Sequence, residues 1–193
     1  RALGVSSERR DPLGLEPYPL GPSTGAWGLL GEGTGSSTLA DVSRDGRWAI
    51  ESRLLSRGDN DLYLLDLATG SETLLTPHSG PATFAGAPFA PDGRAIYLIS
   101  NGDRDLLAFA RIALDAAGRP GPVEVVAARD DAELQEFDLG EDGAITALVW
   151  NRAGLNELAF YDPASGATSA GPALPGEVVM GLHFARDGHT LAM

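Results

Sequence analysis

The residues best suited to acid–base or metal chemistry are three histidines, His78, His183 and His189. No two of them have the i, i+4 spacing that places two metal ligands on one face of a helix. His183 stands between Leu182 and Phe184 in a short apolar stretch, which favours a histidine satisfied in the core or at a sheet edge. A Ser-His-Asp triad within the chain would need one of these three imidazoles.

Two glycine-rich segments have the spacing of catalytic or phosphate-binding motifs. Residues 21–25, G-P-S-T-G, match the G-x-S-x-G of hydrolase nucleophiles, which requires a strand before the serine and a helix after it. Prolines before and within this motif exclude both elements, so Ser23 is predicted to be a loop residue. Residues 31–36, G-E-G-T-G-S, lack the lysine of a Walker loop and the last glycine of the dinucleotide fingerprint, and they too are predicted to form a loop.

Short acidic segments give weak indications of a metal site. Asp59-Asn60-Asp61 and Asp103-Arg104-Asp105 lack the glycine and the distal glutamate of a calcium loop, so they are interpreted as turn caps. Residues 57–59 spell the adhesion tripeptide R-G-D, but in a hairpin they are more simply a tight turn.

Three tryptophans, Trp27, Trp48 and Trp150, could line a ligand surface. Trp48 and Trp150 fall in apolar segments with strand character, so core packing is the simpler interpretation. The sequence therefore predicts no catalytic, cofactor-binding or metal-binding residue in this chain, and no cofactor.

The composition excludes several classes of partner. The 193 residues carry 14 basic and 27 acidic side chains, a net charge of −13, and every basic residue is arginine. A chain this acidic repels nucleic-acid phosphates and anionic membranes. No apolar run approaches about 18 residues, so no membrane-spanning segment is predicted. The absence of cysteine removes disulfides, thiolate nucleophiles and cysteine-based zinc sites.

The elements that would position any site are set by an internal repeat. The dipeptide Asp-Gly begins at Asp45, Asp92, Asp142 and Asp187, with spacings of 47, 50 and 45 residues. Each copy has an apolar residue three positions before the aspartate and a small residue two positions before it. Asp-Gly between apolar segments is a strong hairpin signal, because glycine accepts a positive φ.

A second turn signal follows each of the first three Asp-Gly pairs, at residues 66–70, 115–118 and 162–166. A polar break lies between the two signals, so each repeat is predicted to hold four short strands. The predicted strands are 48–54, 61–67, 72–75, 95–100, 106–114, 123–127, 144–150, 157–161 and a weak one near 167–170.

Several of these strands are apolar on both faces, such as A-I-Y-L-I at 95–99, which indicates a sheet covered on both sides. Four strands per repeat and two-sided burial are typical of a β-propeller blade. The predicted fold class is all-β, a β-propeller fragment of about three and a half four-stranded blades. Residues 130–137 are helix-like in composition but are interpreted as a loop entering the innermost strand of the third repeat.

The predicted blades lie near residues 38–80, 81–129 and 130–175, with a partial blade at 177–193, so that 38–193 is a partial propeller. Residues 1–37 are rich in glycine, proline and serine and are predicted to be the end of a preceding blade plus loops. Propellers close with about four to eight blades. Because the chain begins at Arg1 and stops in mid-strand at Met193, we expect it to be a fragment of a longer protein.

Two segments carry a family resemblance. Residues 89–98, F-A-P-D-G-R-A-I-Y-L, resemble the F-S-P-D-G-R-x-I-x-F blade motif of TolB-like and prolyl-oligopeptidase propellers. Residues 61–70, D-L-Y-L-L-D-L-A-T-G, resemble the third strand and turn of the same blades. The third and fourth repeats depart from the motif, since Glu141 and Arg186 stand where proline is usual and Ala144 replaces an arginine.

Within this group the chain looks most like the N-terminal, WD-repeat-like propeller of an acylaminoacyl-peptidase-like serine peptidase of the prolyl oligopeptidase family. That resemblance implies a non-catalytic portion that restricts entry to short peptides. Its partner would be an α/β-hydrolase domain of the same parent chain, which carries the Ser, Asp and His triad. It also implies a cytoplasmic location.

Two alternatives stay open. The first is a TolB-like propeller that acts as a protein-binding scaffold, which implies a periplasmic location. The second is an enzyme with its active site in the propeller channel, which would need histidines, arginines and carboxylates converging on the innermost strands. The sequence indicates no repeated ring of that kind.

Overall fold

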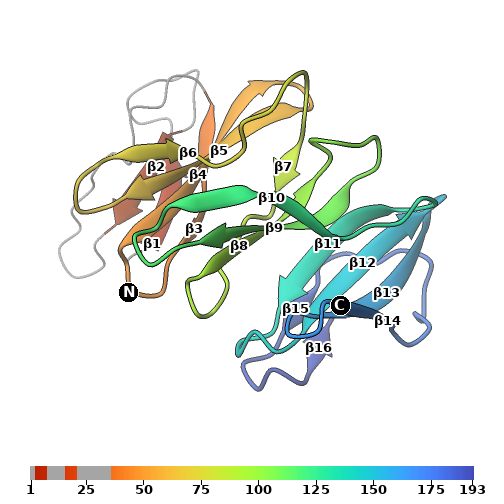
Figure 1. The fold of residues 1–193 in the computed structure, drawn as a ribbon. Coiled ribbons are helices and arrows are strands. Elements are labelled where there is room, and N and C mark those ends of the chain that lie inside the picture. The colour runs from red at the N-terminus through yellow and green to blue at the C-terminus, as the bar shows by residue number, and fades with distance from the viewer. Residues whose placement is uncertain (1–2, 8–15, 21–35) are drawn as a thin grey trace.

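The structure is a computed structural model that describes residues 3–7, 16–20 and 36–193. These residues form strands, turns and loops without a helix. Successive antiparallel sheets stand side by side along the chain (Figure 1). The predicted all-β propeller fragment is confirmed.

Three four-stranded sheets follow one another, and we call them blades 1, 2 and 3. Blade 1 consists of β3 (Ser37–Val42), β4 (Trp48–Ser56), β5 (Asp59–Asp66) and β6 (Glu72–Leu74). Blade 2 consists of β7 (Phe84–Ala85), β8 (Ala95–Ser100), β9 (Ala108–Leu114) and β10 (Pro120–Ala127). Blade 3 consists of β11 (Glu133–Leu139), β12 (Thr146–Arg152), β13 (Leu155–Asp162) and β14 (Ala167–Ala170).

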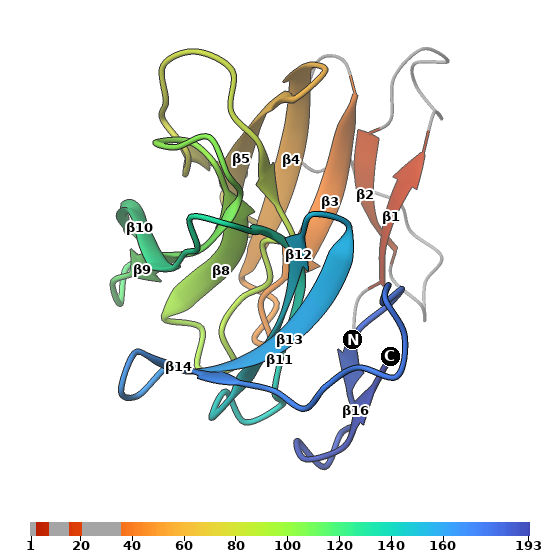
Figure 2. The same cartoon turned by 90° about the vertical axis from the view of Figure 1, so that its right-hand side faces the viewer.

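Two-stranded sheets stand before and after the blades. β1 (Leu3–Ser7) pairs with β2 (Glu16–Leu20), and β15 (His183–Phe184) pairs with β16 (Leu191–Ala192). The pair β1–β2 lies beside β3 (Figure 2). The division of the chain at residue 37 and the blade boundaries derived from the repeats stay predictions.

The Asp-Gly turns occupy equivalent positions in the four repeats, between the first and second strand of each sheet. In each turn the glycine N–H donates to the carbonyl oxygen three residues earlier. The aspartate Oδ1 accepts the N–H two residues later, at 2.8–3.0 Å. The four glycines have φ between +69° and +73°, the region that disfavours any side chain. Asp-Gly therefore sets the register of every sheet, as its spacing predicts.

The core lies between the blades. Ile96 and Leu98 on β8 pack against Ile50 of blade 1, while Tyr97 on the same strand packs against Leu148 of blade 3. Successive residues of a strand point to opposite faces, so a blade between two neighbours needs apolar residues at every position. This explains the continuous apolar run of β8, all of whose residues are buried.

The innermost strand of blade 2 is the least regular. β7 has two residues, and the chain returns to pair with β8 through one isolated bridge between Phe89 and Ile96. Between them Gly86 and Ala87 have φ of +81° and +32°, and Pro88 has no N–H to donate to a ladder. The sequence predicts that the helix-like stretch 130–137 is a loop that enters the innermost strand of the third repeat. Residues 130–132 lead into β11, but residues 133–137 belong to the strand itself, so the loop prediction is wrong for them.

Candidate functional site at the propeller axis

One sequence position recurs in every repeat, four residues before the aspartate of the Asp-Gly turn. It lies on β3, β11 and β15, and in blade 2 it follows the end of β7. Asp41, Pro88, Asp138 and His183 occupy it. The first three of these repeats meet at a hollow of about 230 Å³, which Asp41, Pro88 and Asp138 all line. The first strands are therefore the innermost ones, and the hollow marks the axis around which the blades are arranged. We call this hollow the axial hollow.

Asp41 links blade 1 to blade 2. Its Oδ2 accepts the backbone N–H of Phe89 at 2.8 Å, and its Oδ1 accepts the N–H of Val42 at 2.8 Å. Burial raises the pKa of the Asp41 carboxyl above its ordinary value, while the two N–H donors oppose that rise. Both carboxylate oxygens are thus engaged by backbone, which makes Asp41 a connection between blades rather than a free acid.

Blade 3 repeats this arrangement towards β15. Asp138 Oδ2 accepts the N–H of Phe184 at 2.5 Å, and Glu136 Oε1 accepts the N–H of Leu182 at 3.0 Å. In blade 2 the equivalent residue is Pro88, whose side chain has no acceptor. The repeated carboxylates therefore join blade 1 to blade 2 and blade 3 to the β15–β16 hairpin.

An ion pair spans the axial hollow between blades 1 and 3. Arg44 Nη2 donates to the carbonyl oxygen of Glu141 at 2.9 Å and lies 3.1 Å from its carboxylate. The two side chains are 56% and 59% exposed, so water screens the pair. Exposed pairs of this kind contribute about 0–1 kcal/mol, which makes this contact easy to break.

The chemistry available in the axial hollow is electrostatic. Its lining brings the carboxylates of Asp41, Asp138 and Glu141 towards the guanidinium of Arg44. The described residues of this lining include no serine, threonine or histidine, so they offer no pair of a hydroxyl nucleophile and an imidazole base. Such a site favours a cationic group, for example the amine of a peptide.

His78 is built into the segment that joins blade 1 to blade 2. Its Nδ1 lies 2.8 Å from the carbonyl oxygen of Thr76, and its Nε2 lies 3.0 Å from Asp59 Oδ1. Asp61 Oδ1 lies 3.6 Å from Nδ1. Both ring nitrogens thus face acceptors, and the bonds to Thr76 and Asp59 raise the pKa of His78. Because the Thr76 carbonyl and the Asp59 carboxylate are both acceptors, the two bonds are complete only in the protonated imidazole, in which neither nitrogen retains a lone pair for base catalysis.

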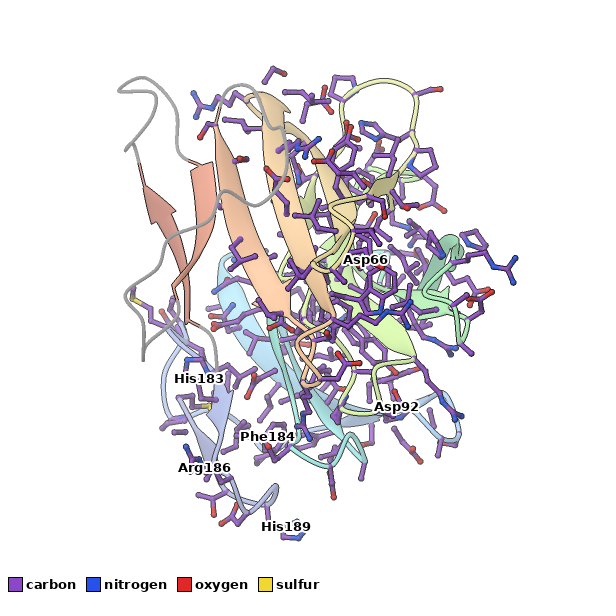
Figure 3. All side chains as sticks on the ribbon, turned by 90° about the vertical axis from the view of Figure 1, so that its left-hand side faces the viewer. Asp66, Asp92, His183, Phe184, Arg186 and His189 are labelled. Atoms are coloured by element: carbon purple, nitrogen blue, oxygen red, sulfur yellow. The ribbon has the colours of Figure 1, made fainter. Side chains whose placement is uncertain are left out.

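The other two histidines share the β15–β16 hairpin, where both are exposed. Figure 3 shows His183 and His189 there together with Phe184 and Arg186. His183 lies on a strand at the rim of the described fold, so the edge interpretation is right and the buried one is wrong. The two histidines and His78 are not brought together.

The acidic segments serve local structure. Asp59 pairs with His78 instead of capping a turn, and Arg104 Nε donates to its neighbour Asp103 at 3.2 Å. Arg57-Gly58 is a two-residue turn between β4 and β5, with Gly58 at φ +77°, as the turn interpretation predicts. Among the described residues no cluster of three or more histidine or acidic side chains is arranged to hold a metal ion.

Both described tryptophans belong to cores between blades, as predicted. Trp150 is 2% exposed between blades 2 and 3. Trp48 packs against the core between blades 1 and 2, and its ring lies directly over Gly118. Trp27, Ser23 and the glycines of residues 31–35 lie outside the described residues. Across the described ranges, no helix has the length and apolarity to traverse a bilayer.

The carboxylate pattern at the axis is the feature that sequence reasoning missed. We expected no repeated ring of charged residues on the innermost strands, and that expectation is partly wrong, since Asp41 and Asp138 recur in register. Aligning the repeats on the Asp-Gly turns and looking four residues upstream would have found them. Both carboxylate oxygens of Asp41 and Oδ2 of Asp138 accept backbone N–H groups.

No protein-family model matches the chain, and no curated protein matches it. Solved structures do. A putative TolB from Agrobacterium tumefaciens matches 86% of this chain with a TM-score of 0.67 and 22% sequence identity. Prolyl oligopeptidase B from Galerina marginata matches 96% of it with a TM-score of 0.72 and 12% identity. A puromycin hydrolase matches 81% with a TM-score of 0.59 and 17% identity.

The chain is part of a β-propeller. At these identities the likeness establishes the fold, and the resemblance to TolB-like and prolyl-oligopeptidase propellers is confirmed at that level. The matches cover 59% of the TolB chain, 27% of the oligopeptidase chain and 27% of the puromycin hydrolase chain. The chain therefore spans less than two thirds of each of these proteins.

Proposed function

We propose that this chain is the non-catalytic propeller portion of a serine peptidase of the prolyl oligopeptidase kind, where it restricts access of peptides to a separate hydrolase domain. The observation that carries the proposal is the match to prolyl oligopeptidase B. Nearly the whole chain, 96%, corresponds to 27% of that protein, which leaves ample length there for a catalytic domain.

The described residues support a non-catalytic role. A serine nucleophile needs an imidazole with a free lone pair within hydrogen-bond reach. His78 uses both ring nitrogens on Thr76 and Asp59, and the exposed rings of His183 and His189 form no hydrogen bond to a serine among the described residues. The chemistry of such an enzyme would therefore be supplied by another domain of the parent chain.

The axial hollow supports the gating part of the proposal. Its carboxylates would attract the ammonium group of a peptide, and the exposed Arg44–Glu141 pair across it is weak enough to open. A propeller whose axis is partly closed by a breakable contact would pass short peptides and exclude folded chains. Under this proposal the parent protein acts in the cytoplasm.

The test is labelling of the whole protein that contains this chain with a fluorophosphonate, which reacts with activated serines. We expect the whole protein to be labelled and the 193-residue chain alone to remain unlabelled. A whole protein without a labelled serine would contradict the peptidase proposal. Labelling of the isolated chain would contradict its non-catalytic role.

Gating has its own test in the labelled protein. Arg44→Ala removes both contacts across the hollow, whereas Glu141→Ala removes only the ion pair and leaves the bond to the backbone carbonyl, so kcat/KM for long peptides relative to short ones should rise more in Arg44→Ala. Arg119→Ala is the matched control, because Arg119 forms an exposed ion pair with Asp115 at a blade turn and does not line the axial hollow. An unchanged ratio in both hollow variants would argue against passage along the axis.

A second candidate is a protein-binding scaffold of the TolB kind. The observation in its favour is that the chain corresponds to 59% of the Agrobacterium protein, a larger share than of either hydrolase. Under this alternative the protein would work in the periplasm. A whole protein that carries a signal peptide and no reactive serine would favour it, and fractionation of the native protein would locate it.

A further inference from the structure

A pocket of about 350 Å³ opens between blades 2 and 3, on the side of the Asp-Gly turns. It lies above the core that contains Tyr97, Phe109 and Tyr161. Most of its wall is apolar, formed by Ala90, Pro91, Ala95, Leu139, Pro163 and Ala164. Its volume falls at the lower end of small-molecule sites, which run from about 300 to 1,000 Å³. We call it the inter-blade pocket.

Arg111 lines this pocket from β9 and has no partner among the residues that the structure describes. Its Nε is buried and makes no hydrogen bond. Its cross-strand neighbours are Tyr97 on β8 and Glu124 on β10, and in the described part of the chain no carboxylate lies within ion-pair distance of it. The side chain is half-buried, so one of the five donors of its guanidinium, the one at Nε, is left unpaired away from water, which is costly.

Thr146 lines the same pocket from blade 3. The residue is fully buried, and its hydroxyl oxygen has no hydrogen-bond partner within the described ranges. Two polar groups from neighbouring blades are thus left unsatisfied at one place, although buried polar groups are normally paired.

Tyr97 and Tyr161 lie close enough to Arg111 for its charge to affect their pKa values. Burial raises the pKa of Tyr97 and of Tyr161, and the positive charge of Arg111 opposes the rise in both. The two hydroxyl groups are therefore neutral donors close to a cation. Tyr97 lines the pocket together with Arg111 and Thr146, so three side chains that can donate hydrogen bonds face it, while Tyr161 lies in the core beneath.

The two aspartates that line the pocket already accept hydrogen bonds within their own turns. Asp92 Oδ1 accepts the N–H of Arg94, and Asp142 Oδ1 accepts the N–H of Ala144, within their Asp-Gly turns. Their two negative charges balance those of Arg94 and Arg111, both of which line the pocket, so the pocket is not strongly basic and disfavours a doubly charged phosphate. A single negative charge attached to an apolar group matches both the unpaired guanidinium and the apolar wall.

We propose that the inter-blade pocket binds a small carboxylate, the α-carboxylate of an amino acid or of a peptide C-terminus. Arg111 holds the carboxylate in a two-point contact, and the Thr146 hydroxyl donates a further hydrogen bond. The apolar part of the ligand packs against Pro91 and Leu139. This site is separate from the axial hollow and does not depend on the proposed function.

The test is calorimetric titration of the chain with N-acetyl-L-leucine and with N-acetyl-L-leucinamide, which differ only in the charge of the carboxyl group. The acid should bind at least about tenfold more tightly than the amide, as for a hydrogen bond to a charged group. Free L-leucine and the tripeptide Ala-Ala-Leu distinguish the two sources of the carboxylate. Binding of the tripeptide and not of free leucine assigns the pocket to peptide C-termini, and binding of free leucine and not of the tripeptide assigns it to amino acids.

Substitutions in the pocket test whether the acid binds there. Arg111→Gln should abolish the preference for the acid, and Thr146→Val should weaken acid binding about threefold to tenfold. Arg119→Gln is the matched control, since it removes one positive charge from the turn after β9 without touching the pocket. Thr146→Val keeps the side-chain shape, so it tests the site even where Arg111→Gln lowers the melting temperature. Equal binding of acid and amide, tighter binding of inorganic phosphate, or wild-type affinity in both pocket variants would overturn the proposal.

Discussion

Asp41 on β3 accepts a hydrogen bond from the backbone N–H of Phe89, 48 positions later in the sequence and in the next blade. The same relationship joins Asp138 to Phe184, 46 positions apart. Each bond connects the innermost strands of consecutive repeats at the point where their Asp-Gly turns begin. A side chain thus aligns one blade on the next, while the sheets themselves pair only within a repeat.

Asp41→Ala should therefore destabilise the fold. The substitution leaves the N–H of Phe89 without its acceptor, and an unsatisfied buried donor costs about 1–3 kcal/mol. Urea denaturation measures the change in the free energy of unfolding. Asp105→Ala is the control, because Asp105 is exposed and forms no hydrogen bond or ion pair among the described residues. Equal stability of the two variants would show that the inter-blade bond contributes nothing.

Gly118→Ala should be more harmful than the same change at an equivalent turn. A Cβ at Gly118 would lie 2.3 Å from Cζ2 of Trp48, and the residue has φ +80°. Gly70 ends the corresponding turn of blade 1 with φ +74°, and a Cβ there would meet no atom within 4 Å among the described residues. Backbone strain alone costs about 1–2 kcal/mol at either site, and the clash with the ring adds about 1–3 kcal/mol at Gly118.

Thermal or urea unfolding of Gly118→Ala beside Gly70→Ala separates these two costs. The difference between the variants reports the packing of the indole of blade 1 against the turn between β9 and β10 of blade 2. Identical losses would mean that the tryptophan can move aside without cost. The expected order is therefore wild type, then Gly70→Ala, then Gly118→Ala as the least stable.

The stability of the chain should fall above neutral pH because of His78. Its folded-state pKa is raised above the ordinary value of 6.5 by its bonds to Thr76 and Asp59. The stabilising contribution is complete below pH 6.5 and is lost as the pH rises through the folded pKa. The lowered pKa of Asp59 acts at the acid end, where its contribution is lost as the pH falls through the folded pKa, below 3.8.

Urea denaturation at a series of pH values from about 6 to 9 measures this effect, since imidazoles are the only side chains of this cysteine-free chain whose ordinary pKa lies within that range. Replacing His78 by asparagine should flatten the dependence. Replacing the exposed His189 by asparagine should leave it as in the wild type. A wild-type curve that rises through this range would mean that the imidazole is neutral in the folded chain.

The parts of this fold that the sequence predicts are those with a strict local cause. Asp-Gly demands a tight turn with a positive φ at Gly46 and its counterparts, so its spacing alone places every hairpin. The bonds of Asp41 and Asp138 could not be predicted in the same way, because each depends on how one repeat is placed against the next. That Arg111 lacks a partner is even harder to predict from the sequence. It depends on which side chains the neighbouring strands place beside it, and the described ones provide no acceptor.

The irregular first strand of blade 2 is another feature that the sequence predicts only in part. Gly86 and Pro88 indicate that the innermost strand is interrupted, but they do not say what occupies the space. In the structure the ring of Phe137 from blade 3 fills it, at 2.7 Å from where a Cβ of Gly86 would lie. The absence of a side chain at one residue is explained only by a residue 51 positions away in the chain.

The isolated chain should self-associate, and more strongly as salt is added. Several large apolar side chains are exposed, among them Val178 at 62% and Met180 at 88%, beside a two-stranded sheet with a free edge in the described part of the fold. Burying apolar surface yields about 25 cal/mol per Å², so a few hundred Å² amount to several kcal/mol. The net charge of −13 opposes this association. This charge repulsion extends over about 30 Å at 0.01 M salt but only about 8 Å at 0.15 M.

Sedimentation velocity at the two salt concentrations follows the balance between burial and charge repulsion. We expect a mostly monomeric chain at low salt and larger species at physiological salt, because screening removes the repulsion while apolar burial remains. Val178→Ser together with Met180→Ser should shift the balance back towards the monomer by removing apolar surface next to the open edge. A cooperatively melting monomer of 20.1 kDa at both salt concentrations would contradict the prediction and would mean that the sheet edges are already protected within this chain.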